Sequence, residues 1–240
     1  MATRLIVISC SRYQAAWKPF HTLLHKFVQY PNHWKNGLIT DGEAFMDLDK
    51  LRYACPFEDL YATVGDNGWC RNFHFALDKM DPNDLILLFQ EDFFITAPVP
   101  SHVLHLVEQF MLDNPRVGCF RLYPCPGPKY PAVHGLVAGL PFGEVHPGED
   151  YRISCQVAMW RVSYLKKIVP TIGNAMHFEL AGTDLSLMYP EKVLSLLRPQ
   201  HNQWPLQYIC SGISKGRWNP DALKLFEEHG IPKPEPIGVL

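Results

Sequence analysis

The sequence predicts one α/β domain in which a mostly parallel central sheet is flanked by helices. Short β-branched apolar runs alternate with segments of helical periodicity through the first half of the chain, a pattern typical of parallel sheets. The run 85–89 is continuously apolar, as expected for a strand that is buried on both faces. The length of 240 residues is sufficient for one large domain with a full core.

The first half of the chain supplies most of this alternation. The predicted helices have apolar residues at a period near 3.6, and each predicted strand is a short apolar run. The predicted order is a strand at 5–8, a helix at 17–30 that Pro31 ends, strands at 37–40 and 60–63, a helix opening at 65–69, and the central strand at 85–89.

The second half continues the alternation around a long loop. The predicted elements are an apolar run at 93–95, a helix capped by Ser101, a strand at 117–122, a Pro- and Gly-rich loop at 123–147, a strand at 151–160, a helix at 164–169, a helix start near 177–184, and a late strand at 204–210. A loop of this length inside a compact domain is usually functional. We therefore expect this loop to belong to a site and to divide the domain into a half at 1–122 and a half at 123–240.

Composition narrows the class of protein. The formal net charge of −2 argues against a broad electrostatic surface for nucleic acid or anionic membrane. The seven cysteines are scattered and form no CxxC pair, so we expect no zinc ribbon and a reducing, cytoplasmic location. No apolar run is long enough to span a membrane, and the N-terminal run is too short for a signal peptide.

Polar residues follow several of the predicted strands. Ser9 and Arg12 come directly after the first strand, where an α/β sheet commonly holds a nucleotide; Arg12 could equally be an exposed loop residue. Asp41 could bind a ribose hydroxyl or make an Asx turn. Asp66 can cap the following helix and is a further candidate nucleotide contact.

Two adjacent carboxylates end the central strand. Gln90, Glu91 and Asp92 stand between the apolar runs 85–89 and 93–95, where ionised side chains must be solvated, paired or bound to a cation. Carboxylates at the carboxyl end of such a strand can hold a divalent metal on a diphosphate. The alternative is a pair of solvated turn acids.

The second half offers a candidate base. Ser154, Gln156 and Ala158 would point from the predicted strand toward a site, and Glu179 and Asp184 lie near a predicted helix start. Either acid could take a proton from an attacking hydroxyl. The alternative is that both acids only complement the helix dipole.

A late segment carries cations. Lys215, Arg217 and Trp218 follow the predicted strand 204–210 in a segment with two glycines, which would suit contact with a departing diphosphate. The spacing is not that of a phosphate-binding Walker loop. His201, just upstream, is a candidate third metal ligand, although a lone histidine is usually structural.

Taken in order, these segments resemble glycosyltransferases of the GT-A fold, most closely sugar transferases of bacteria and viruses. The resemblance spans roughly Leu5 to Trp218. The segments that carry the resemblance are the first strand with its small polar loop, the acidic end of the central strand, the strand at 151–160, His177–Gly182 and Gly212–Trp218.

The resemblance implies a Rossmann-like N-terminal half that binds a nucleotide-diphosphate sugar, and a Mn²⁺ or Mg²⁺ ion held by a DxD motif. Here Gln90 replaces the first Asp of that motif, which leaves Asp92 as the best metal ligand and Glu91 as the second. By the same resemblance Glu179 would be the catalytic base, with Asp184 in reserve, and Lys215 and Arg217 would steady the diphosphate.

Two other functions remain open from the sequence. A nucleotidyltransferase usually needs a glycine-rich basic loop after the first strand, and residues 9–13 contain no glycine. A non-catalytic nucleotide- or sugar-binding module fits the incomplete DxD motif. The acceptor could be a glycan, a protein, a small molecule or, in a viral setting, a hydroxymethylated DNA base; Tyr123, Tyr130, His134 and Phe142 could stack on a sugar or base.

Overall fold

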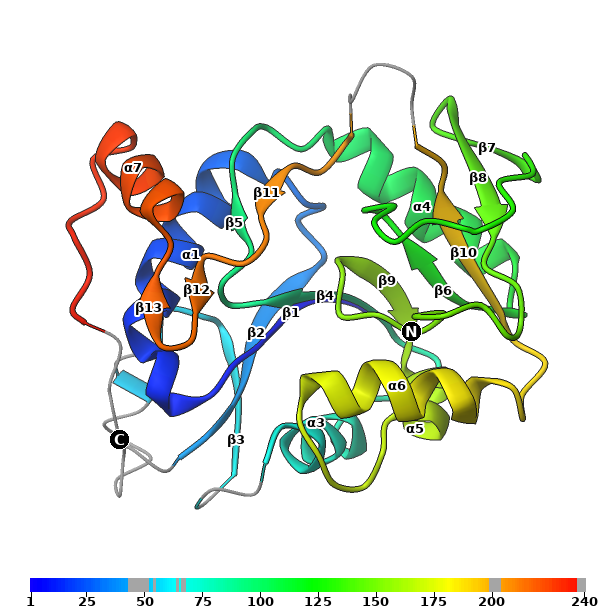
Figure 1. Cartoon of the computed structure of the whole chain (residues 1–240), viewed down its shortest axis with the longest axis horizontal. Helices are drawn as coiled ribbons and strands as arrows, with labels where there is room; N and C mark the ends of the chain where they lie inside the picture. Colours follow the sequence, from blue (N-terminus) through cyan, green and yellow to red (C-terminus); the bar gives the residue numbers. More distant parts are fainter. Residues whose placement is uncertain (43–51, 54, 64, 66–67, 199–203, 237–240) are drawn as a thin grey trace.

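The computed structural model describes residues 1–42, 52–53, 55–63, 65, 68–198 and 204–236. Within them, one nine-stranded sheet has the order β3-β2-β1-β4-β9-β6-β10-β8-β7 (Figure 1). The strands are β1 (Thr3–Ile8), β2 (Lys35–Asp41), β3 (Asp59–Thr63), β4 (Leu85–Gln90), β6 (Val117–Arg121), β7 (Gly135–Val137), β8 (Leu140–Glu144), β9 (Ala158–Arg161) and β10 (Lys192–Leu196). Only β8 and β9 run against the other strands of this sheet. The predicted mostly parallel sheet is therefore confirmed.

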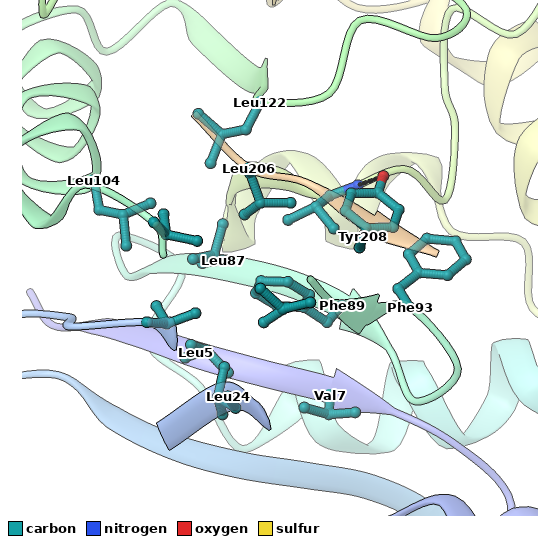
Figure 2. Packing of buried hydrophobic residues seen from close by; sticks show 14 of the residues in the cluster. Leu5, Val7, Leu24, Leu87, Phe89, Phe93, Leu104, Leu122, Leu206 and Tyr208 are labelled. Carbon is teal, nitrogen blue, oxygen red and sulfur yellow. Dashed lines mark hydrogen bonds between the residues drawn. The ribbon is translucent and has the colours of Figure 1, made fainter. Parts of the chain in front are cut away.

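Helices cover both faces of the sheet. They are α1 (Gln14–Phe27) and α4 (Ser101–Asp113) on one face, and α3 (Trp69–Asp78), α5 (Val162–Ile168) and α6 (Ala175–Ser186) on the other. In β1, Leu5 and Val7 join the core beneath α1 and α4, whereas Ile6 and Ile8 join the core beneath α3, α5 and α6. This alternation follows from the two-residue period of a strand. Figure 2 shows the first of these two cores, in which Leu24 of α1 packs near β1.

The C-terminal segment returns to the end of β4. Its elements are β11 (Tyr208–Ile209), β12 (Ile213–Ser214), β13 (Arg217–Trp218) and α7 (Pro220–Glu228). Two short elements occur earlier in the chain: η1 (Ser11–Tyr13) follows β1, and β5 (Phe94–Ile95) follows β4. Strand β11 pairs antiparallel with β5, which follows β4 by only a few residues. This pairing brings residues after 208 to the carboxyl end of the central strand.

The antiparallel strand β9 lies between β4 and β6. Ala158 is paired with Leu88 of β4 on one side and with Arg121 of β6 on the other. Because β9 runs the opposite way, its first residue lies near the carboxyl ends of its neighbours. The residues that precede β9, 154–157, are thereby placed at the same edge of the sheet.

Several predicted boundaries are wrong. The strand expected at 151–160 pairs only at Ala158–Arg161, and the strand expected at 204–210 pairs only at Tyr208–Ile209. Residues 151–157 keep their apolar burial, with Ile153 and Val157 both fully buried, although they form turns and bends. Apolar spacing reports burial, and here burial occurs without strand pairing.

The predicted helix at 17–30 is displaced toward the N-terminus, because α1 spans Gln14–Phe27. The helix that carries Glu179 begins at Ala175, where the Asn174 side chain accepts a hydrogen bond from the backbone N–H of His177. Glu179 is therefore one turn inside the helix. No helix in the described ranges is long and apolar enough to cross a bilayer, and all seven cysteines are free thiols.

Candidate functional site

The carboxyl ends of three parallel strands meet at one edge of the sheet. Ile8 of β1 is paired with Ile39 of β2 and with Gln90 of β4. The residues that follow these strands therefore lie together, at the position where open α/β sheets bind ligands. We call this region the carboxyl edge, and its members are Ser9, Cys10, Asp41, Gln90, Glu91 and Asp92.

The loop after β1 uses its backbone amides internally. The N–H groups of Ser9 and Tyr13 donate to the carbonyls of Ile39 (2.8 Å) and Cys10 (2.9 Å). The N–H of Ser11 donates to Asp41 Oδ1 at 2.9 Å. Asp41 is 5% exposed and joins the end of β2 to the loop after β1. Because its partner lies 30 residues away, this contact is not an Asx turn, and the nucleotide role of Asp41 stays a prediction. Arg12 is exposed beside this loop.

Glu91 points into the face of the sheet covered by α1. Its carboxylate is hydrogen-bonded to the Ser9 side chain, and Ser9 Oγ accepts a hydrogen bond from Nε1 of the buried Trp17 at 2.8 Å. Burial, reinforced by the neighbouring Asp92 carboxylate, raises the pKa of Glu91 well above its ordinary value. Folding therefore shifts Glu91 toward the protonated form relative to an exposed glutamate.

Asp92 points toward the C-terminal segment instead. The Ser211 hydroxyl donates to Asp92 Oδ2, and the Gly212 N–H donates to the Asp92 carbonyl at 2.8 Å. Burial raises the pKa of Asp92, and the bond from Ser211 opposes that rise. A Cβ atom on Gly212 would lie 2.2 Å from the Phe94 ring and 2.9 Å from the Asp92 carbonyl, so only glycine allows this close approach.

These carboxylates do not form a metal site by themselves. The Glu91 carboxylate bonds the Ser9 side chain, whereas the Asp92 carboxylate accepts from Ser211 of the C-terminal segment. Across the described ranges, no three His, Cys, Asp or Glu side chains are arranged to hold an ion. His201 and Asp66 lie outside the described residues. The metal site therefore stays a prediction from the sequence.

Gln90 is buried at the same edge with a side-chain nitrogen that has no partner among the described residues. Leu87 and Phe89 face the α1 side of the sheet, whereas Leu88 faces the α3 and α6 side, and strand alternation puts Gln90 with Leu88. The side chain is 8% exposed, and its Nε2 has no hydrogen-bond partner among the described residues. Such a buried amide needs an acceptor, and a phosphate or sugar oxygen would supply one.

Glu179 and Asp184 are separated by the helix that carries them. Glu179 Oε1 accepts hydrogen bonds from Ser154 Oγ at 3.0 Å and from the Cys155 N–H at 2.8 Å. Asp184 is exposed. Five residues along an α-helix correspond to about 500°, which rotates Asp184 roughly 140° away from Glu179. The structure thus directs Glu179, and not Asp184, toward residues 154–156.

A series of contacts connects Glu179 with the C-terminal segment. The Gln156 N–H donates to Ser154 Oγ at 3.3 Å, and the Tyr208 hydroxyl donates to Gln156 Oε1. Gln156 Nε2 donates to Cys210 Sγ at 3.6 Å. Cys210 directly precedes Ser211, the partner of Asp92.

Tyr208 and Ser211 belong to the site, although no sequence pattern indicated a role for them. The available signal was the position of both residues beside the Gly-Ile-Ser-Lys-Gly-Arg segment, which was of interest for its cations, its glycines and Trp218. Tyr13 interacts electrostatically with Glu91 and Asp92, and its only signal was its place after Arg12 in the loop that follows β1.

Arg121 fixes the loop that leads to Glu179's partners. It is 1% exposed and lies at the end of β6. Its guanidinium donates to the carbonyls of Pro126 (2.5 Å), Tyr151 (3.0 Å) and Arg152 (2.9 Å). Burial lowers the Arg121 pKa, and Glu179 is among the groups that oppose this change. Both ends of the long loop are thus attached to one buried cation.

Of the four residues expected to stack on a ligand, only Tyr123 adjoins the site, with its ring 4.6 Å from that of Tyr208. Phe142 is a core residue, because its ring packs against Phe110 at 5.0 Å and it is 6% exposed. Tyr130 and His134 are exposed elsewhere on the loop.

The hairpin of β12 and β13 begins beside Asp92. Lys215 and Arg217 are exposed at its turn, where both can reach solvent anions. Trp218 packs against Phe94 and Phe226, and its Nε1 donates to the Glu235 carbonyl at 3.1 Å. Trp218 therefore has a packing role, and the structure gives no support to its predicted nucleotide contact.

A groove of about 570 Å³ lies between α1 and the C-terminal residues 229–235. Gln14, Lys18, Thr22 and Lys233 are among its lining residues, but none of the carboxylates above is. The carboxyl edge, with its buried donor and paired acids, has the better chemistry for a reaction.

No protein-family model and no curated protein sequence matches the chain. Solved structures do match. S. aureus TarS in complex with UDP has a TM-score of 0.50 and 16% sequence identity, over 82% of this chain and 58% of that one. The WbbM bifunctional glycosyltransferase has a TM-score of 0.45 and 9% identity, over 82% and 39%. UDP-glucose pyrophosphorylase complexed with UDP-glucose has a TM-score of 0.49 and 8% identity, over 97% and 100%.

These identities support a conclusion about the fold alone. The chain has a GT-A-like α/β fold, as the resemblance in the sequence implied, and it spans a little over half the length of the TarS structure.

Proposed function

We propose that the chain is a glycosyltransferase that moves a sugar from a nucleotide-diphosphate sugar to a hydroxyl acceptor. The observation that carries this proposal is the junction at the carboxyl edge: a half-buried Glu179 connects through residues 154–156, Tyr208 and Cys210 to the Ser211–Asp92 pair. The fold shared with UDP-bound TarS supports a nucleotide donor.

Glu179 would act as the base. Its two hydrogen bonds from Ser154 and Cys155 both go to Oε1, which orients the carboxylate and leaves Oε2 to accept the proton of an acceptor hydroxyl. Sugar transfer passes through an oxocarbenium-like state. The attacking oxygen must become more nucleophilic as the diphosphate leaves, and a positioned carboxylate provides this.

The diphosphate would lie between Gln90 and the β12–β13 hairpin. The unpaired Gln90 Nε2 can donate to a phosphate or sugar oxygen, and Lys215 and Arg217 would offset the charge that develops on the departing group. We propose that Arg12 and Tyr13 line the nucleoside end, beside the loop after β1. If a divalent metal binds, Asp92 and Glu91 are the residues predicted to hold it, and it would stabilise the same developing charge.

The same geometry disfavours a nucleotidyltransferase. That reaction binds a triphosphate beside the loop after the first strand, where free backbone N–H groups would cradle it. Here the N–H groups of Ser9, Ser11 and Tyr13 already have acceptors, and one of these is the Asp41 carboxylate. A carboxylate at this point repels a triphosphate.

Thermal unfolding with nucleotide diphosphates and nucleotide sugars, each with Mn²⁺ or with EDTA, tests the donor site. A ligand at a hundred times its Kd adds about 2.7 kcal/mol to the stability, and each kcal/mol shifts Tm by roughly 2–4 °C in a chain of this size. A shift of roughly 5–10 °C with one sugar nucleotide is expected. No shift with any nucleotide, with or without the metal, rejects the proposal.

Turnover then tests the base. Release of the nucleoside diphosphate should fall about 10²–10⁴-fold in Glu179→Gln, with sugar-nucleotide binding retained. Asp184→Asn is the matched control, since it removes a carboxylate from the same helix, and it should keep wild-type activity. Loss of activity in Asp184→Asn alone would transfer the role to Asp184. Binding without any turnover would indicate a binding module.

A further inference from the structure

We infer that the acceptor is a neutral carbohydrate, whose ring stacks on an aromatic surface made by Tyr123 and Trp204 and whose hydroxyl is held by Gln156. This inference rests on the proposed function and names the acceptor class that it leaves open. We call these residues, with Tyr208 and Phe93 behind them, the aromatic wall.

The aromatic wall runs outward from the carboxyl edge. Phe93 directly follows Asp92, and its ring stacks on Tyr208 with centroids 4.9 Å apart and an interplanar angle of 16°; Figure 2 shows these two rings beside one another near Phe89. Tyr123 packs on Tyr208 at 4.6 Å, and Trp204 packs on Tyr123 at 5.8 Å. Four rings from three separate chain segments therefore adjoin one another.

The inner and outer rings of the wall differ in exposure. Phe93 and Tyr208 are 6% and 8% exposed, whereas Tyr123 and Trp204 are only partly buried. Core packing explains the inner pair, but it leaves part of the outer pair in contact with solvent. Exposed aromatic faces bind the C–H face of a sugar ring because they remove apolar surface from water without requiring a charge.

Gln156 supplies a polar group beside this surface. Its Oε1 accepts from Tyr208 and its Nε2 donates to Cys210 Sγ at 3.6 Å, a weak bond to sulfur. An amide nitrogen carries two hydrogens, so a second donor remains for a sugar hydroxyl. The backbone N–H of Gln156 donates to Ser154 Oγ, which itself donates to Glu179, so the residue that would hold the hydroxyl lies next to a partner of the proposed base.

The charges around the wall favour a neutral ligand. Cys210, at its inner end, interacts electrostatically with the carboxyl groups of Asp92 and Glu179. Near the outer end, Arg198 Nη2 lies 3.9 Å from Cys125 Sγ, and the buried Arg121 interacts electrostatically with Tyr208. A nucleic acid would bring several phosphates toward the carboxyl groups at the inner end, whereas its binding depends on neutralising those phosphates.

Saturation-transfer NMR on the full chain with bound UDP tests the inference. The probes are cellobiose, maltose, N,N′-diacetylchitobiose and an oligothymidylate. At least one disaccharide should receive saturation. Removal of one stacking ring in Tyr123→Leu or Trp204→Leu should weaken that binding roughly 5-fold or more. Tyr130→Leu is the matched control, because Tyr130 is an exposed tyrosine of the same loop (65% exposed), and it should leave the binding unchanged.

The other outcomes separate failure of the carbohydrate inference from failure of the donor site. If UDP binds and no disaccharide does, or if only the oligothymidylate does, the carbohydrate inference is overturned while the donor site stands. Disaccharide binding that survives both wall variants overturns the placement on the wall. Tyr123→Phe keeps the ring and should retain binding, which separates loss of stacking from loss of fold. Failure of UDP itself to bind rejects the proposed function on which the inference rests.

Discussion

Replacement of Arg121 by methionine should detach the long loop from the sheet. Methionine retains much of the stem but removes a guanidinium that donates to three carbonyls, those of Pro126, Tyr151 and Arg152. An unsatisfied buried acceptor costs about 1–3 kcal/mol, so three cost roughly 3–9 kcal/mol. Water can reach Pro126 and Tyr151, which are exposed. We therefore expect a loss near the lower end, about 3–5 kcal/mol.

Urea unfolding and hydrogen exchange together measure this effect. With an m value of about 3 kcal/mol/M, the unfolding midpoint should fall by roughly 1 M or more, and amides in residues 122–157 should exchange faster than in the wild type. Arg161→Met is the matched control, because Arg161 also donates to three carbonyls, those of Val117, Met111 and Asn114, at the opposite edge of the sheet. If both variants accelerate exchange in 122–157 equally, or if Arg121→Met changes neither quantity, the attachment argument is wrong.

Two further predictions concern the acidic end of β4. Burial raises the pKa of Glu91, so its contribution to stability is fully present below the unfolded pKa of about 4.3 and is lost as pH rises through the folded pKa. Glu91→Gln should therefore raise Tm at pH 8 and leave it unchanged near pH 4; parallel melting curves across this range would contradict the assignment. Gly212→Ala should lower the free energy of unfolding by about 1–3 kcal/mol through overpacking against Phe94, and it should weaken sugar-nucleotide binding by displacing Asp92. Ser214→Ala, at an exposed position of the adjoining strand, should do neither. Thermal melting and ligand titration measure the two effects.

Local pattern was sufficient to predict part of the sheet and the acids that follow its central strand. It did not predict β10, and β7 and β8 lie within the segment 123–147 that was expected to be a loop. The apolar runs at 5–8 and 85–89 correspond to β1 and β4, and the carboxylates after β4 lie at the carboxyl edge because the end of a strand is visible in the sequence. The expectation that Glu179 outranks Asp184 agrees with their orientation on α6, although its role as base stays a prediction.

The remaining site residues depend on contacts that no local pattern encodes. Ser211 meets Asp92 across 119 residues, and Tyr208 meets Gln156 across 52. The strand predicted at 151–160 was too long because Arg121 binds the carbonyls of Tyr151 and Arg152, which holds this part of the chain in a loop. A buried arginine on a distant strand leaves no periodic signal at the segment it fixes.

The position of β9 means that two strands of the sheet are synthesised before the strand that joins them. Strands β4 and β6 do not pair with one another, since β9 fills the space between them. During synthesis, both strands leave the ribosome before residues 158–161, so each has an unpaired edge until β9 inserts. Unpaired edges invite association with other chains. Strand β6 also pairs with β10, so it keeps an unpaired edge until residues 192–196 have been made, and the nascent chain stays open to association with other chains until then. Ser154 and Gln156 reach the carboxyl edge only when β9 inserts.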